Sequence, residues 1–151
     1  MTGWSEAETI ALATRAARGA GLHTAQASLY GAAAARHLAA GRQAASLGAA
    51  LDAAAGTSRL LTRVLSLAAG RFSLPVHPLT CSALECLPGC ISYDIADMIT
   101  GIYHPQSVPA ARTAARLEVP DTLALMWESL ALRTYVPESA VSRAGAGAAE
   151  S

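Results

Sequence analysis

Three cysteines and one histidine lie close together in the second half of the chain and could bind a metal ion. The thiols of Cys81, Cys86 and Cys90 follow His77, and thiolate and imidazole groups are the ligands that Zn²⁺ takes in structural sites. The spacing, Cys-x4-Cys-x3-Cys, differs from the Cys-x2-Cys pair of most zinc modules, and cysteine is also a commonly buried residue. The pattern leaves two interpretations open, a zinc-stapled module and a set of core cysteines.

Two Arg-Gly stretches near the ends of the chain form a second candidate site, this time for an anion. They read Ala-Arg-Gly-Ala-Gly at 17–21 and Ser-Arg-Ala-Gly-Ala-Gly at 142–147. Guanidinium groups bind carboxylates and phosphates through paired hydrogen bonds, and glycine lets the backbone approach the ligand closely. The candidate anion-binding residues are Arg15, Arg18, Gly19, Gly21, Arg133, Tyr135, Ser142 and Arg143. The alternative is that Gly19 ends a helix, Gly21 supplies a positive φ and Arg18 stabilises the negative end of that helix.

Four histidines supply candidate acid–base groups, since an unperturbed imidazole titrates near neutral pH. His23, His37, His77 and His104 show no spacing that is typical of a catalytic set. The chain also contains no P-loop, no G-x-S-x-G motif and no G-x-G-x-x-G fingerprint. The sequence therefore assigns no catalytic residue and no cofactor, and it leaves open whether the protein is an enzyme.

Composition limits the classes of protein to which the chain can belong. Hydrophobic residues make up 52% of the 151 residues and charged residues 15%, which excludes a disordered chain. The formal net charge is zero, which argues against a nucleic-acid partner because phosphate neutralisation supplies most of that affinity. The chain has neither an apolar run long enough to span a bilayer nor a recognisable signal peptide. We therefore expect no membrane partner and a cytoplasmic location, in which the three cysteines stay reduced.

Helical periodicity and capping signals run along most of the chain. Ser5 and Glu8 form a capping box, Gly19 and Gly41 can end helices, and alanine, the best helix former, is abundant. In the second helical segment small residues recur every four positions, which would let a neighbouring helix pack closely. Helices are expected at about 6–18, 24–40, 43–54, 58–69, 79–87, 92–101 and 109–117, with a last helix opening at 120–121.

These elements predict an all-α fold. The domain is expected to be a single helical bundle over 1–143 with Ala/Gly-faced helix contacts, followed by a mobile tail over 144–151. Within the expected helix at 92–101, the apolar side chains recur at the spacing of one helix face, and they are Ile95, Met98, Ile99 and Ile102. At most one short β hairpin is expected, from the segments 71–76 and 133–136.

The two ends of the chain resemble a bacterial family of domains of unknown function. The opening "WSEAETIALATRAARGAGL", with the following "AAAARHLAAG", is similar to the start of that family, and "LALRTYVPESAVSRAGAGA" is similar to its close. The resemblance implies a bacterial cytoplasmic protein without an assigned reaction. The recurring positions that it implies are Arg15, Arg18, Gly19, Gly21, Arg133, Tyr135, Pro137, Ser142 and Arg143.

Three functions remain as hypotheses. The first is a protein that acts mainly through protein–protein contact, as a homo-oligomer or an accessory subunit, because alanine-faced helices are abundant and no catalytic set is recognised. The alternative is an enzyme or binding protein for a small anionic metabolite, held by the Arg residues near the two ends. The second alternative is the zinc-stapled module.

Overall fold

The computed structural model describes residues 2–106 and 116–134, which form both helices and strands. The helices are α1 (Glu6–Gly19), α2 (Thr24–Ala39), α3 (Ala45–Asp52), α4 (Ala54–Leu65), α5 (Thr80–Leu84) and α6 (Asp121–Ala131), with the 3₁₀ helix η1 (Leu132–Thr134). The strands are β1 (Thr2–Trp4), β2 (Gly70–Pro75), β3 (Gly89–Ile95), β4 (Met98–Pro105) and β5 (Leu117–Val119).

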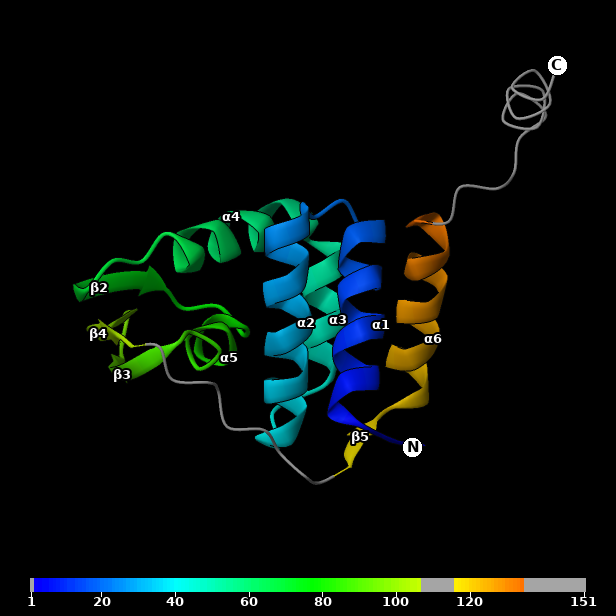
Figure 1. Cartoon of the computed structure of the whole chain (residues 1–151). Coiled ribbons are helices and arrows are strands. Elements are labelled where there is room, and N and C mark those ends of the chain that lie inside the picture. The colour runs from blue at the N-terminus through cyan, green and yellow to red at the C-terminus, as the bar shows by residue number, and fades with distance from the viewer. Residues whose placement is uncertain (1, 107–115, 135–151) are drawn as a thin grey trace, which may run out of the picture.

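The helices and the larger sheet occupy opposite ends of the molecule. Figure 1 shows α6 at one end, α1, α2 and α3 in the middle, and the sheet of β2, β3 and β4 at the other end. Helix α1 packs between α2 and α6, while α5 joins α2 and α4 near the sheet. The strand β1 pairs with β5, so the start of the chain is tied to the segment that leads into α6. No helix in the described ranges has the length and apolarity needed to cross a bilayer.

Two antiparallel sheets overturn the prediction of an all-α helical bundle. One sheet contains β1 and β5, and the other has the strand order β2-β4-β3. The chain is therefore a mixed α/β protein, and 1–143 is not a purely helical domain. The predicted mobile tail over 144–151 lies outside the described residues.

The segment expected to form a helix at 92–101 is instead the hairpin of β3 and β4. Its apolar spacing is compatible with a helix, but Ile95 is 60% exposed and Met98 and Ile102 are each 39% exposed, so only Ile99 of that set is buried. Isoleucine, threonine and tyrosine favour strands because branched and aromatic side chains pack well on a pleated surface. These local preferences and the pairing with β2 outweigh the helical period.

Two further predicted segments also change. The segment 71–76 largely coincides with β2, but β2 pairs with β4 rather than with 133–136. Of that second segment, Arg133 and Thr134 belong to η1, and 135–136 lie outside the described residues. The predicted helix at 109–117 ends on Leu117, which begins the strand β5, and its residues 109–115 also lie outside the described part.

The ends of two helices agree with the sequence signals. Ser5 caps α1 through its side chain, and the carboxylate of Glu8 accepts a hydrogen bond from the Ser5 amide, as the capping box predicts. Helix α6 begins at Asp121, directly after Pro120, and buries Leu123 and Trp127. Local capping signals and helical spacing were sufficient to predict these two helix starts because both depend on neighbouring residues.

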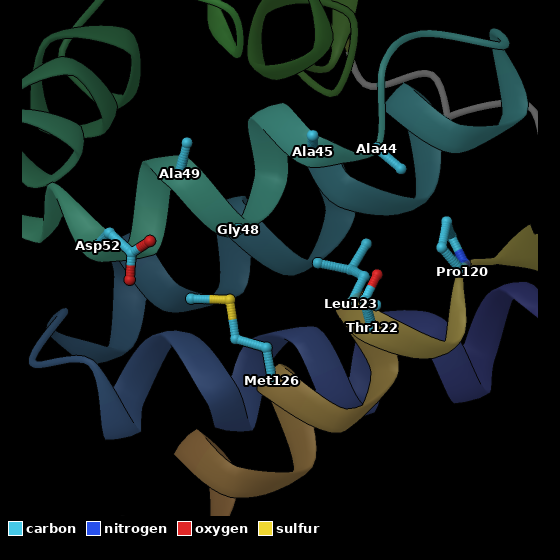
Figure 2. A pocket seen from close by; sticks show the side chains of 9 residues that line it. All are labelled: Ala44, Ala45, Gly48, Ala49, Asp52, Pro120, Thr122, Leu123 and Met126. Carbon is cyan, nitrogen blue, oxygen red and sulfur yellow. The ribbon is translucent and has the colours of Figure 1, made fainter.

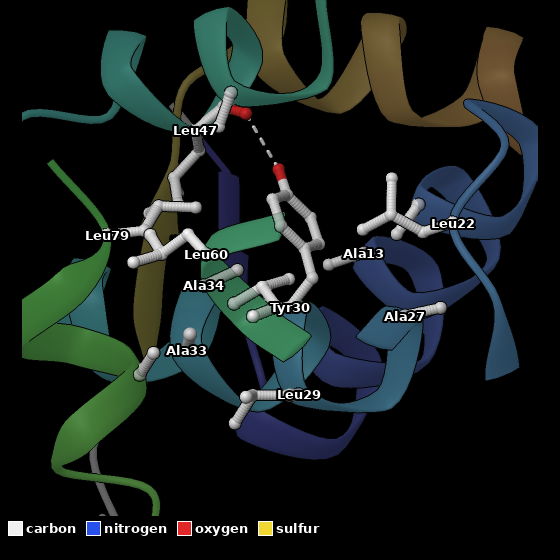
Figure 3. Packing of buried hydrophobic residues seen from close by; sticks show 14 of the residues in the cluster. Ala13, Leu22, Ala27, Leu29, Tyr30, Ala33, Ala34, Leu47, Leu60 and Leu79 are labelled. Carbon is white, nitrogen blue, oxygen red and sulfur yellow. Dashed lines mark hydrogen bonds between the residues drawn. The ribbon is translucent and has the colours of Figure 1, made fainter. Parts of the chain in front are cut away.

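A hydrogen-bonded tyrosine connects three helices in the core, and Figure 3 shows its bond to Leu47. The hydroxyl of Tyr30 on α2 donates to the carbonyl of Leu47 on α3 over 2.8 Å. The same oxygen accepts a hydrogen bond from the indole Nε1 of Trp127 on α6, over 3.1 Å. Tyr30 and Trp127 are fully buried. The Tyr30 hydroxyl and the Trp127 indole N–H therefore find their hydrogen-bonding partners inside the protein, through these two bonds.

Two glycines allow close contacts between helices, and Gly31 belongs to the small-residue pattern of the second predicted helix. A Cβ atom at Gly31 on α2 would overlap the side chain of Thr14 on α1. A Cβ atom at Gly19 would overlap the backbone carbonyl of Leu130 on α6. Gly19 is thus both the last residue of α1 and the place at which α6 contacts α1.

Candidate functional site

A cluster of polar side chains lies where the helices meet the larger sheet. It joins α2, the loop that follows α2, the short helix α5 and the strand β3. We call this cluster the polar junction, and its members are Arg36, His37, Arg42, Ser82, Glu85 and Tyr93. It is the richest collection of chemically capable groups among the described residues.

His37 and Ser82 form a buried hydrogen-bonded pair within the polar junction. The Nε2 of His37 lies 2.8 Å from the carbonyl oxygen of Gln43, which can only accept, so Nε2 carries the proton. In the neutral ring Nδ1 then accepts, and the Ser82 hydroxyl donates to it over 2.9 Å. The Ser82 oxygen in turn accepts a hydrogen bond from Arg42 over 2.8 Å.

Glu85 collects the remaining donors of the polar junction. Arg42 donates to both carboxylate oxygens, over 2.6 and 3.1 Å, and Arg36 donates to one of them over 3.2 Å. The Tyr93 hydroxyl donates to the Glu85 carboxylate over 3.0 Å. Partial burial alone would raise the pKa of Glu85, but the hydrogen bonds from Arg42, Tyr93 and Arg36 outweigh burial and place this pKa below its usual value.

A serine hydroxyl on a histidine nitrogen is the geometry of an activated nucleophile, but access to solvent excludes that role here. Ser82 is fully buried and His37 is 2% exposed, so no substrate can reach either group in this conformation. Burial lowers the pKa of His37, although its hydrogen bond to Gln43 partly opposes the shift. Every hydrogen-bonding group of the pair has a partner inside the protein, so the polar junction acts as a structural connection between helices and sheet.

The four predicted zinc ligands do not come together. Among the described residues no group of three or more His, Cys, Asp or Glu side chains is placed to hold a metal ion. The thiol of Cys86 donates to the carbonyl of Ser82, and burial raises its pKa to about 11. Cys90 is exposed on β3, while the Nδ1 of His77 accepts from the Leu79 amide. These cysteines and the histidine therefore serve separate local contacts.

The predicted anion-binding residues near the chain start occupy the C-terminal half of α1 and the turn after it. Arg15 and Arg18 are exposed on α1, and Arg133 is exposed on η1, which packs against α1. Gly21 adopts a φ of 106°, so the interpretation of this glycine as a turn residue is confirmed. Gly19 packs against α6 rather than facing an open site.

The structure does not complete the predicted anion clamp. Arg15 lines a hollow between α1 and α6, but Arg18 and Arg133 do not line it, and the carboxylate of Glu128 does. A carboxylate in the same hollow opposes the binding of an anion there. The remaining candidates, Tyr135, Ser142 and Arg143, lie outside the described residues, as does Pro137 of the family resemblance, so the clamp stays a prediction.

The outer side of α6 offers an open surface of a different kind. Leu125 on α6 is 64% exposed, and Leu132, the first residue of η1 directly after α6, is 72% exposed. The two leucines lie seven positions apart, about two helical turns, which places them on one side of the continuous segment of α6 and η1. The side chains between them on that side are polar. We call this ridge the α6 face, and its members are Thr122, Leu125, Glu128, Ser129 and Leu132.

Two hollows flank the α6 face. The groove between α3 and α6 has a volume of about 460 Å³, and Figure 2 shows the side chains of Leu123 and Met126 reaching across it toward Gly48. Its α3 wall is built from Ala44, Ala45, Gly48, Ala49 and Asp52. The hollow on the other side, between α1 and α6, has a volume of about 480 Å³ and is lined by Leu12, Arg15, Glu128, Ala131, Leu132 and Thr134.

Sequence reasoning missed both regions. The polar junction joins residues that lie as many as 49 positions apart, as in the pair of Arg36 and Glu85, and no local spacing marks such a pair. The exposed leucines had a local signal. Leu125 falls outside the buried positions of α6, Leu123, Trp127 and Leu130, and this mismatch indicates a leucine that faces solvent.

Comparisons with known proteins give no match from which a function could be inferred. No protein-family model matches the sequence, and neither the curated proteins nor the solved structures give a significant match. Membership in the bacterial family suggested by the two ends therefore stays a prediction. The function has to be inferred from the polar junction and the α6 face.

Proposed function

We propose that the protein acts by binding another polypeptide through the α6 face and its two flanking hollows. The observation that carries this proposal is the pair of exposed leucines, Leu125 on α6 and Leu132 at the start of η1, on the side opposite the buried residues of α6. A grouped pair of large apolar side chains beside a groove is typical of a surface that becomes covered on binding. A helix ridge with a hollow on each side also has the shape into which a second helix packs.

The contrast with the polar junction favours binding over catalysis. At the polar junction the nucleophile and base candidates, Ser82 and His37, are buried and hydrogen-bonded within the chain. At the α6 face no catalytic pair lines the hollows, and the α3–α6 groove is mostly apolar. A surface of this kind supplies buried apolar area to a partner rather than proton transfer or nucleophilic attack. We also propose a cytoplasmic location, which the three free cysteines support.

Site-specific photo-crosslinking in the native host tests the proposal. The photoreactive residue p-benzoylphenylalanine is placed at Leu125, on the α6 face, and in a matched variant at Ser73, which is exposed on β2 at the other end of the molecule. Irradiation is expected to give a covalent protein adduct at Leu125 and none at Ser73. Adding Leu132→Glu to the Leu125 probe should reduce the adduct by about tenfold, because the charge would be buried at the contact.

Two results would contradict the proposal. The first is that no protein adduct forms at Leu125 when the variant is expressed at its native level. Mass spectrometry must then show that the photoreactive residue is intact. The other is an equal yield of the same adduct at Leu125 and at Ser73, which would indicate random collision. Circular dichroism of each variant checks that the fold is retained, and little change is expected because the substituted positions are exposed.

A further inference from the structure

We infer that the outer rim of the polar junction is a binding site for a phosphate group, held by the guanidinium groups of Arg36 and Arg42. Both groups donate to the same carboxylate oxygen of Glu85, over 3.2 Å and 3.1 Å, so the fold holds two permanent cations side by side. Arg42 is fixed further by Ser82 and by the second Glu85 oxygen. This site is separate from the α6 face and from the anion clamp predicted near the ends of the chain.

Glu85 and Ser82 use only part of the hydrogen-bonding capacity of the two guanidinium groups. Arg36 donates through its Nε alone, so the N–H groups of both its terminal nitrogens have no partner among the described residues. Arg42 donates through its two terminal nitrogens, and its Nε–H has no partner in that part of the chain. The side chains of Arg36 and Arg42 are 43% and 30% exposed, so an anion can reach them from solvent although Ser82 is buried.

The charges at the rim also favour an anion. Two guanidinium groups contact one carboxylate, so their positive charge exceeds the negative charge that touches them. Glu6 on α1 is a second carboxylate in this region, since Glu6 raises and Arg36 lowers the pKa of the Cys86 thiol. In the described ranges, however, no ion pair joins Glu6 to Arg36. The surplus positive charge is therefore available to a ligand.

The number of free donors favours phosphate over carboxylate as the ligand. A carboxylate presents two oxygens, which one guanidinium group can satisfy through two parallel hydrogen bonds. A phosphate group presents at least three oxygens and carries a charge of about −1.5 to −2 near pH 7. It can accept hydrogen bonds from Arg36 and Arg42 at once and offset their surplus charge, while Glu85 keeps the two groups in place.

Titration of the full chain with sodium phosphate near pH 7, with sodium chloride adjusted to keep the ionic strength constant, tests this inference. Nuclear magnetic resonance of the arginine Nε–H groups shows which arginines the ligand contacts. The signals of Arg36 and Arg42 are expected to shift along a saturating curve, while that of Arg59, exposed on α4, stays unchanged. A parallel titration with methyl phosphate distinguishes a site for free phosphate from one that also accepts phosphate esters.

Two substitutions should change the phosphate affinity in opposite directions. Arg36→Gln should weaken binding about tenfold or more, because it removes one cation and its charge-assisted hydrogen bonds. Glu85→Gln should strengthen binding about tenfold, because it removes the negative charge that opposes the ligand. Arg59→Gln is the matched control and should leave the affinity unchanged. Circular dichroism checks the fold of each variant, and the Arg36→Gln comparison is decisive even if Glu85→Gln fails to fold.

Three results would overturn the inference. Non-saturating shifts of equal size at Arg36, Arg42 and Arg59 would show a general ion atmosphere rather than a site. An Arg36→Gln variant that binds phosphate as tightly as the native chain would show that the two guanidinium groups do not form the site. An affinity for acetate as high as that for phosphate, measured in the same way, would contradict the ligand class.

Discussion

The polar junction and the α6 face differ in how completely the fold uses their side chains. In the polar junction Glu85 accepts hydrogen bonds from two arginines and a tyrosine, and Ser82 and His37 are buried. On the α6 face Leu125 and Leu132 are more exposed than buried, and the hollows beside them are open. The region that looks most like an active site is closed, and the region without reactive groups is available for contact.

This difference shows that residue chemistry alone does not locate a functional surface. Hydrogen-bonded polar groups in a low-dielectric interior hold two parts of a fold in one arrangement, and removing one partner leaves the others unsatisfied. Exposed apolar side chains contribute little to the stability of the single chain but gain free energy when a partner covers them. The two regions should therefore respond in opposite ways to substitution.

The largest expected effect comes from the glycine at which α6 contacts α1. Gly19→Ala places a Cβ atom on the backbone of Leu130, and backbone cannot rotate away as a side chain can. We expect the free energy of unfolding to fall by about 3 kcal/mol, the upper end for an overpacked contact, with loss of α6-face binding as α6 is displaced. Urea unfolding followed by circular dichroism measures the first effect and the Leu125 photoprobe the second.

Gly56→Ala is the control for that substitution. Gly56 lies in α4, and a Cβ atom there would meet nothing closer than an Arg59 guanidinium nitrogen at 3.9 Å. The change should stabilise the protein by about 0.5 kcal/mol, because alanine loses less backbone entropy in a helix than glycine does. Equal destabilisation by both variants would show that α6 does not depend on close approach at Gly19.

An intermediate effect is expected when the two regions are changed separately. Ser82→Ala removes the donor to His37 and an acceptor for Arg42, and it should cost about 2 kcal/mol in the free energy of unfolding while binding at the α6 face persists. Leu132→Glu should change that free energy by less than about 0.5 kcal/mol and reduce binding at the α6 face about tenfold. Chemical denaturation measures the free energy of unfolding of both variants, and the crosslinking yield measures their binding. If each variant changed both the free energy of unfolding and the crosslinking yield, the two regions would not act independently.

The smallest effect is expected from pH, since it removes no atom from the polar junction. Burial lowers the pKa of His37 in the folded protein, and burial also lowers the pKa of His77, while an unfolded histidine titrates near 6.5. Above about pH 6.5 both states are neutral and stability is complete. As pH falls below this value the unfolded chain takes up protons first, so stability declines until the folded pKa is reached.

Urea unfolding at pH 8.0 and 5.5 measures this decline while Glu85, whose pKa lies below its usual value, stays ionised. His37→Gln keeps one donor and one acceptor and should reduce the pH dependence relative to the native chain. The matched control is His104→Gln at an exposed position of β4, which shows what the removal of a histidine outside the polar junction does to the same measurement. An unchanged pH dependence in His37→Gln would show that the buried imidazole is not coupled to stability.

The sequence predicted the helices that are capped locally and failed where strands compete. The capping box at Ser5 and Glu8 and the opening of α6 at Asp121 follow from neighbouring residues, and both were correct. The isoleucines of 95–102 fit a helix period and a strand equally well in a short window. The β preference of these residues, the pairing of β3 with β4 and the pairing of β4 with β2 together favoured the strands. The β2 partners lie 23 to 33 residues before their β4 positions, and residue spacing does not record that pairing.

By itself the sequence determined the neutral charge, the apolar composition, the starts of α1 and α6 and the glycine turns, because each depends on residue type or on neighbours a few positions away. The tertiary structure decided which polar groups are satisfied and which leucines remain exposed. Ser82 meets His37 across 45 positions, and Leu125 stays uncovered only because α1 and α3 contact the other sides of α6. Burial is a property of the packed chain, so the distinction between the polar junction and the α6 face arises only after folding.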